Sequence, residues 1–141
     1  MKYKIIITVL LILFSVSNQA QTKIIAHRGF SDIAPENTLI AFQKAIEIGA
    51  DYFELDVHQT KDGILVVIHD NTVNRTSSNN KTGKIRELDY SEILGVKVGY
   101  SKKFDAQFPD EKIPTLEEAL QLAKGKIKVC VELKTDGIVK E

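Results

Sequence analysis

Tyr52-Phe53-Glu54-Leu55-Asp56-Val57-His58 alternates apolar and polar side chains, and this period of two predicts a β-strand. Glu54 and Asp56 then share one face of the strand, while the apolar side chains share the other. Two neighbouring carboxylates on a short apolar strand repel each other and lose hydration, so a cation normally lies between them. An edge strand with one wet face is the simpler alternative. Histidine and carboxylate motifs at the ends of other strands favour a functional site.

Composition limits the class of protein. The chain has 141 residues, 19 basic and 19 acidic side chains and 43% hydrophobic residues, which is enough for one modest core. The balanced charge gives no electrostatic reason to expect a nucleic-acid partner. Cys130 is the single cysteine, so no disulfide forms within the chain.

The first 20 residues have the three-part pattern of a secretory signal peptide. Lys2 and Lys4 give a basic start, residues 5–16 form an apolar run, and a polar, small-residue tail ends at Ala20. The run is too short to span a bilayer comfortably, and an uncleaved membrane anchor is the alternative. We therefore expect residues 21–141 to be exported, to the periplasm or the medium, without a stable membrane span after cleavage.

The chain before residue 59 predicts a β-α-β unit. Residues 23–26 form a short apolar strand that ends at His27-Arg28-Gly29. A helix follows, with Asn37 as its expected N-cap and Gly49 as its end. The alternating strand comes next, and a helix between two strands favours parallel pairing.

The connection from Val57 to Ile64 breaks this rhythm, because six intervening residues are too few for a helical crossover. Either Asp62-Gly63 turns a hairpin or the chain returns in extended form. Both alternatives bring His69 near Asp56.

The second half of the chain predicts short helices, loops and a last strand. Residues 71–84 are polar and are expected to be a surface excursion, and residues 96–112 form a long irregular loop. Two capping boxes, Asp89 with Glu92 and Thr115 with Glu118, each begin a helix. In the strand of residues 126–134, apolar side chains share one face, and the other carries Cys130, Glu132 and Lys134.

The acids of the two alternating strands are expected to converge. The apolar parity of each strand suits packing against helices, so Glu54, Asp56 and Glu132 project together on the opposite side. Three carboxylates are hard oxygen ligands that suit one divalent cation, Ca²⁺ or Mg²⁺. The sequence has too few histidines and cysteines for a standard zinc site.

Polar residues at strand ends complete the predicted site. His27 and His69 are candidate general acid and base, because imidazole titrates near neutral pH. Arg28 offers a bidentate fork for a phosphate oxygen. Lys134 either balances phosphate charge or pairs with Glu132. His58 is a spare ligand candidate that we expect to face solvent.

A cation, an arginine and two histidines around one pocket fit phosphodiester cleavage. The cation neutralises charge on phosphorus, one histidine deprotonates a nucleophile, and the other protonates the leaving alkoxide. Acid–base assistance of this kind contributes ~10²–10⁴ in rate per group.

An ordered set of motifs runs from Ile24 to the end of the chain. It comprises His27-Arg28-Gly29, Pro35-Glu36-Asn37-Thr38, Ala41-Phe42, Gly49-Ala50-Asp51, Glu54-Leu55-Asp56-Val57, Thr60-Lys61-Asp62-Gly63, His69-Asp70, Arg75-Thr76, Ile113-Pro114-Thr115-Leu116-Glu117-Glu118-Ala119-Leu120 and Glu132-Leu133-Lys134. With these motifs the chain resembles the glycerophosphodiester phosphodiesterase family.

The resemblance implies an α/β hydrolase with a TIM (β/α)8 barrel, which releases glycerol 3-phosphate and an alcohol such as choline or ethanolamine. It assigns acid–base catalysis to the two histidines, the divalent cation to the three acids, and phosphate binding to Arg28. It also implies that a neighbouring hydroxyl of the substrate is the first nucleophile and forms a cyclic phosphate. No Ser or Cys nucleophile is then needed.

Length is where the chain departs from this family. A TIM barrel needs roughly 250 residues, about twice the length of residues 21–141. Residues 136–140 are expected to begin another helix. We therefore expect the N-terminal half of a barrel domain. The alternatives are a truncated, non-catalytic exported binding module and a phospholipase-like phosphodiesterase that acts on intact lipids. The oligomeric state does not follow from the sequence.

Overall fold

The computed structural model describes residues 22–135. The expected signal peptide and the helix expected to begin at residue 136 lie outside these residues. Within the described part, no helix combines the length and the apolar character needed to cross a bilayer.

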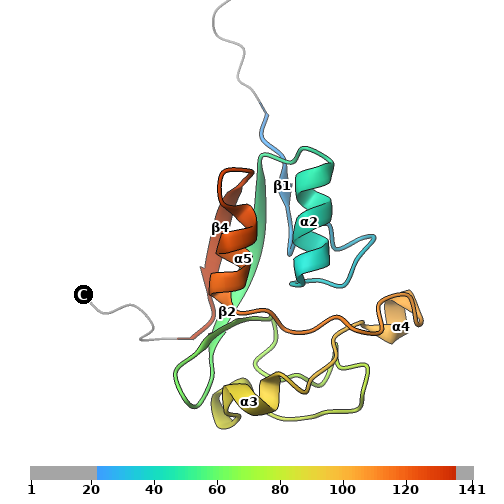
Figure 1. Cartoon of the computed structure of the whole chain (residues 1–141), viewed down its shortest axis with the longest axis vertical. Helices are drawn as coiled ribbons and strands as arrows, with labels where there is room; N and C mark the ends of the chain where they lie inside the picture. Colours follow the sequence, from blue (N-terminus) through green and yellow to red (C-terminus); the bar gives the residue numbers. More distant parts are fainter. Residues whose placement is uncertain (1–21, 136–141) are drawn as a thin grey trace, which may run out of the picture.

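A four-stranded sheet organises the described chain around one central strand, β2 (Tyr52–Gln59) (Figure 1). The strands β1 (Ile25–Ala26) and β4 (Lys128–Leu133) both run parallel to β2. Both pair with the first residues of β2, so they lie on opposite edges of it. The fourth strand, β3 (Leu65–Val67), pairs antiparallel with the end of β2, on the edge opposite β4.

The connection between β2 and β3 is a hairpin, which decides between the two alternatives that the sequence left open. Thr60 N donates to Ile64 O at 2.9 Å, and its hydroxyl accepts from Ile64 N at 2.9 Å. Gly63 has a φ of +89°, a conformation in which a residue without a Cβ is favoured. Beyond β3, Ile68 N still bonds to Asp56 O, so His69 comes back beside the end of β2.

Helices α2 (Leu39–Glu47) and α5 (Leu116–Ala123) cover the apolar side of the sheet (Figure 1). Phe42 of α2 stacks on Phe53 of β2 with ring centroids 4.4 Å apart. This first core cluster consists of Phe42, Ala45, Phe53, Leu55, Val57, Val67, Ala119 and Ala123. The predicted apolar face of β2 is therefore confirmed.

The N-cap of α2 is Thr38, so the prediction of Asn37 is wrong by one residue. Thr38 Oγ1 accepts from Ala41 N at 3.3 Å. Asn37 has a φ of +57° instead, and its side chain bonds to Asp56. A side chain committed to a distant carboxylate is not available to cap the helix.

A second apolar cluster includes Val66 of β3 and residues of the short elements η1 (Ile85–Glu87) and α3 (Tyr90–Ile93), whereas the short helix α4 (Ser101–Phe104) contributes no residue to it. It consists of Val66, Ile68, Val73, Ile85, Ile93, Val96, Val98 and Ile113. Val73 is fully buried, so the segment 71–84 is not purely a surface excursion as predicted. The two predicted capping boxes are both present.

The apolar face predicted for the strand of residues 126–134 is buried only in its first half, around the start of β4. Ile127 and Val129 pack against the first core cluster, as expected. Val131 and Leu133 are 42% and 44% exposed, because none of the described elements covers this part of the apolar face. The fold is α/β with a mainly parallel sheet, and closure into a barrel stays a prediction.

Candidate active site

The three predicted acids meet at one place on the polar side of the sheet. The parallel register of β2 and β4 sets Asp56 opposite Glu132, and Glu54 lies two residues back on the same face. One carboxylate oxygen from each residue lies within 4.8 Å of the others. The structure therefore brings these three carboxylates together, and their role as metal ligands stays a prediction.

Burial and neighbouring charges act differently on the two acids of β2. Burial raises the pKa of Glu54 above its ordinary value, and the nearby Asp56 charge adds to the increase. Asp56 is only 1% exposed, which also acts to raise its pKa. The Asn37 hydrogen bond and the Lys134 ammonium outweigh that burial, so the pKa of Asp56 lies below its ordinary value. Asp56 is thus held ionised in the interior.

The oxygen atoms of these acids fit a hard cation. Glu54 Oε1 is buried and accepts no hydrogen bond from the described residues, which is costly for an ionised carboxylate. Asp56 Oδ1 is buried in the same way and lies 3.1 Å from Lys134 Nζ. Lys134 also forms an ion pair with Glu132, and these contacts raise the pKa of the ammonium. Of its two predicted roles, the described structure displays the pairing with Glu132.

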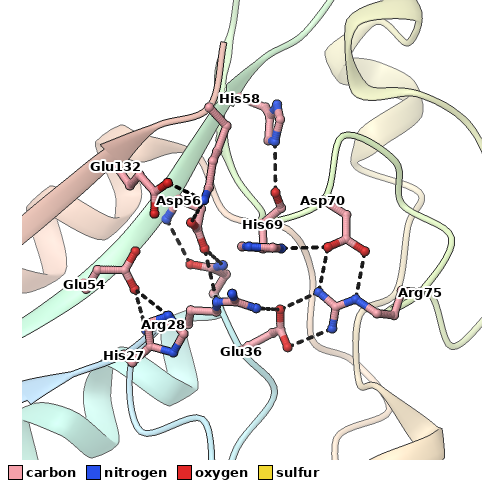
Figure 2. Close-up of polar contacts among 12 residues, drawn as sticks. His27, Arg28, Glu36, Glu54, Asp56, His58, His69, Asp70, Arg75 and Glu132 are labelled. Carbon is pink, nitrogen blue, oxygen red and sulfur yellow. Dashed lines mark hydrogen bonds and ion pairs between the residues drawn. The ribbon is translucent and has the colours of Figure 1, made fainter.

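The two predicted catalytic histidines lie on either side of the acids, at the ends of their strands (Figure 2). His27 follows β1, is 68% exposed along its side chain, and has its Nε2 atom 3.9 Å from Glu54 Oε2. His69 follows β3, and its Nδ1 atom lies 2.8 Å from Asp70 Oδ1. The side chain of His69 is 33% exposed, so both imidazoles are accessible to solvent.

Arg28 lies between the histidines and the acids, in a left-handed backbone conformation with φ of +55°. Its backbone N donates to Glu54 Oε2 at 2.8 Å. The guanidinium donates from Nη1 to Glu36 Oε1 at 2.9 Å and lies 3.4 Å from Asp56 Oδ2 through Nε. Nε is buried and makes no hydrogen bond with the described residues, so its contact with Asp56 is an ion pair only.

The structure adds four residues that the site prediction missed: Asn37, Glu36, Asp70 and Arg75. Asn37 Nδ2 donates to Asp56 Oδ2 at 2.8 Å, and its Oδ1 accepts from Asp56 N at 3.3 Å. The other three form an ion-pair network beside His69. All four stand within motifs that carry the family resemblance, which was the one signal available for them.

His58 is buried, so the expectation that it faces solvent is wrong. It is 7% exposed, and its Nε2 atom lies 3.1 Å from His69 O. Its Nδ1 atom lies 3.3 Å from Thr135 Oγ1, beyond the end of β4. Both ring nitrogens therefore have partners, and His58 is not among the residues grouped around the acid cluster.

A sequence profile of the glycerophosphoryl diester phosphodiesterase family matches residues 27–141. The chain belongs to this family. A glycerophosphodiester phosphodiesterase from Caldanaerobacter subterraneus is 48% identical to this chain over 120 residues. That alignment covers 84% of this chain and 47% of the relative. The chain thus spans about half the length of the curated relatives that it matches.

Solved structures show the same relationship for this glycerophosphoryl diester phosphodiesterase family member. A glycerophosphodiester phosphodiesterase from Agrobacterium tumefaciens superposes with a TM-score of 0.74 at 42% identity, over 80% of this chain and 47% of that one. A phosphodiesterase from Oleispira antarctica, solved in complex with the product sn-glycerol-3-phosphate, gives a TM-score of 0.73 at 36% identity. The second superposition covers 80% of this chain and 44% of that one.

Proposed function

We propose that this chain contributes the catalytic and metal-binding residues of a hydrolase that cleaves glycerophosphodiesters to glycerol 3-phosphate and an alcohol. The observation that carries the proposal is the convergence of Glu54, Asp56 and Glu132 beside Arg28, with an imidazole on either side. Family membership and the product bound to the Oleispira relative support the same reaction class.

In this proposal, the three acids hold one divalent cation, Ca²⁺ or Mg²⁺. Their carboxylate oxygens match the ligands that both ions prefer, and the buried, unpartnered Glu54 Oε1 gives a reason for a cation to bind there. When bound, the cation supplies neutralisation of the negative charge that develops on the phosphoryl oxygens.

The remaining residues bind the phosphate and move protons. Arg28 donates to a phosphate oxygen through its guanidinium, and Lys134 adds a second positive charge. One of His27 and His69 accepts the proton of the attacking hydroxyl, and the other protonates the departing alcohol. The attacking hydroxyl belongs to the glycerol of the substrate, so a cyclic phosphate forms first and water opens it.

Cation binding is measured on the 141-residue chain by titration calorimetry with Ca²⁺ and with Mg²⁺. We expect one site per chain, and we expect Glu132→Gln to weaken the affinity by at least about tenfold, since it removes a ligand charge. Glu87→Gln is the matched control, because Glu87 forms exposed ion pairs away from the site. Equal affinity in both variants would remove Glu132 from the ligand set.

Activity is measured on a chimera in which this chain replaces the matched segment of the Caldanaerobacter relative. We expect release of glycerol 3-phosphate from glycerophosphocholine, and we expect a chelator to abolish it. Activity that persists in the chelator would contradict the cation assignment. A folded chimera that binds glycerophosphocholine without turnover would favour the binding module, and faster cleavage of intact phospholipid would favour the phospholipase-like alternative.

We also propose that the protein is exported to the periplasm or the medium through residues 1–20. Mass spectrometry of the protein recovered from an expressing bacterium tests this proposal. Cleavage close to Ala20 is the expected result, and an uncleaved N-terminus in the cytoplasm would contradict it.

A further inference from the structure

Three charged side chains that the proposed reaction does not use connect Arg28 to His69. Glu36, Arg75 and Asp70 form a continuous series of hydrogen bonds between these two residues (Figure 2). Glu36 precedes α2, while the other two follow β3, so the series joins segments that are 39 residues apart.

The first connection, between Asp70 and His69, concerns which nitrogen of the His69 ring carries the proton. Asp70 Oδ1 lies 2.8 Å from His69 Nδ1. The Arg75 hydrogen bonds lower the pKa of Asp70 to about 2, so the carboxylate is ionised at neutral pH and only accepts hydrogen bonds. In the neutral ring, Nδ1 therefore carries the proton and Nε2 is left as the proton acceptor.

The second connection holds Asp70 in a defined orientation. Arg75 donates from Nε to Asp70 Oδ2 at 2.8 Å and from Nη2 to Asp70 Oδ1 at 2.9 Å. A two-point contact of this kind defines the plane of the carboxylate in addition to its distance. The carboxylate thus cannot rotate away from His69 without breaking a pair of bonds.

The third connection joins the two arginines. Glu36 accepts from Arg75 Nη1 and Nη2 at 2.9 and 2.7 Å, and from Arg28 Nη1 at 2.9 Å. Its side chain is 14% exposed, and although burial acts to raise its pKa, the two guanidinium groups hold that pKa below its ordinary value. One buried carboxylate thereby orients both guanidinium groups.

We propose that Glu36, Arg75 and Asp70 are positioning residues that hold His69 in the Nδ1–H tautomer and place its ring relative to Arg28. The catalytic consequence rests on the proposed function, because it requires His69 to exchange a proton with the substrate or the leaving group. The tautomer itself is a property of the folded chain and is measured without substrate.

Long-range 1H–15N correlation spectra of the histidine-labelled 141-residue chain, recorded at a pH where the rings are neutral, test the tautomer directly. The sequence holds three histidines, and His69→Gln assigns the signals of interest. We expect His69 to display a protonated Nδ1 and an unprotonated Nε2. A protonated Nε2 in the unmodified chain would overturn the proposal.

Two variants test whether the network sets this tautomer. Asp70→Asn presents an amide that can donate to Nδ1, so we expect the ring to change to the Nε2–H form. Arg75→Lys keeps a positive charge but cannot make both two-point contacts, and we expect a mixture of tautomers. Arg86→Lys is the matched control, because Arg86 is exposed and pairs only with Glu87 among the described residues. His69 signals that stay unchanged in Asp70→Asn and Arg75→Lys would overturn the proposal.

Kinetics of the same substitutions in the active chimera separate positioning from a structural role. We expect Asp70→Asn to lower kcat by at least about tenfold while KM changes by less than about twofold. Glu36→Gln should raise KM as well, since it also releases Arg28. Thermal stability losses with unchanged kcat would indicate a structural role and contradict positioning. If the parent chimera is inactive, the proposed function fails, while the tautomer result still decides whether the network sets the His69 proton.

Discussion

The two sides of strand β2 obey different physical rules. On one side, Phe53, Leu55 and Val57 are fully buried under α2 and α5, and any side chain of suitable size and polarity contributes. On the other side, Asp56 is equally buried, yet it depends on Asn37, Arg28 and Lys134 for partners. On the apolar side, the stability of the fold depends on how much apolar surface area is buried. On the polar side, it depends on specific hydrogen-bond and ion-pair partners.

This difference indicates how substitutions on each side should act. A change on the apolar side should lower the free energy of unfolding and leave the site's chemistry unaltered in the molecules that remain folded. A change on the polar side should alter proton transfer or cation binding with a smaller effect on stability, because some of those groups are under-partnered in the folded chain.

The largest expected effect is on the polar side. His69→Ala in the active chimera should lower kcat by ~10²–10⁴, because it removes one of the two proton-transfer groups. Stability measured by urea unfolding should change little, since His69 lies at the edge of the site and its side chain is a third exposed. A kcat within a factor of two of the parent would remove His69 from the reaction.

The next effect is on the apolar side. Phe53→Ala should lower the free energy of unfolding by about 3–5 kcal/mol, through lost apolar burial and the cavity left beside Phe42. Urea unfolding monitored by circular dichroism measures the change. A loss below about 1 kcal/mol would indicate that the stacked pair contributes little to the core.

A matched pair of substitutions tests the role of burial alone. Val57→Thr places a hydroxyl in the fully buried core and should cost about 1–3 kcal/mol. Val131→Thr makes the same chemical change at a position that is 42% exposed, and should stay within about 0.5 kcal/mol. Equal losses would show that the exposed half of β4 is covered in solution.

Acid titration gives the smallest expected effect. The hydrogen bonds from Arg75 lower the pKa of Asp70 from 3.8 to about 2 on folding. The stabilisation is therefore fully present above pH 4 and is lost as the pH falls through the window from about 4 to about 2. We expect about 1–2 kcal/mol after allowance for partial exposure, and Asp70→Asn should flatten the stability curve in this window. An unchanged slope would contradict the assignment.

The sequence by itself determined the features that depend on neighbours along the chain. Alternation defined both faces of β2, and the motifs Asp89 to Glu92 and Thr115 to Glu118 correctly predicted two helix starts. It also predicted that Glu54, Asp56 and Glu132 would meet, because strand parity sets the side on which each carboxylate projects. Local periodicity and local hydrogen bonding suffice for such predictions.

Only the tertiary structure decided which distant groups became partners. The hairpin after β2 brought His69 O to His58, so a residue expected in solvent became buried. Asn37 bonded to Asp56 across 19 residues and left the helix cap to Thr38. Glu36 met Arg75 across 39 residues. A buried charge or amide bonds to whichever group the fold brings near, and spacing along the chain does not encode that proximity.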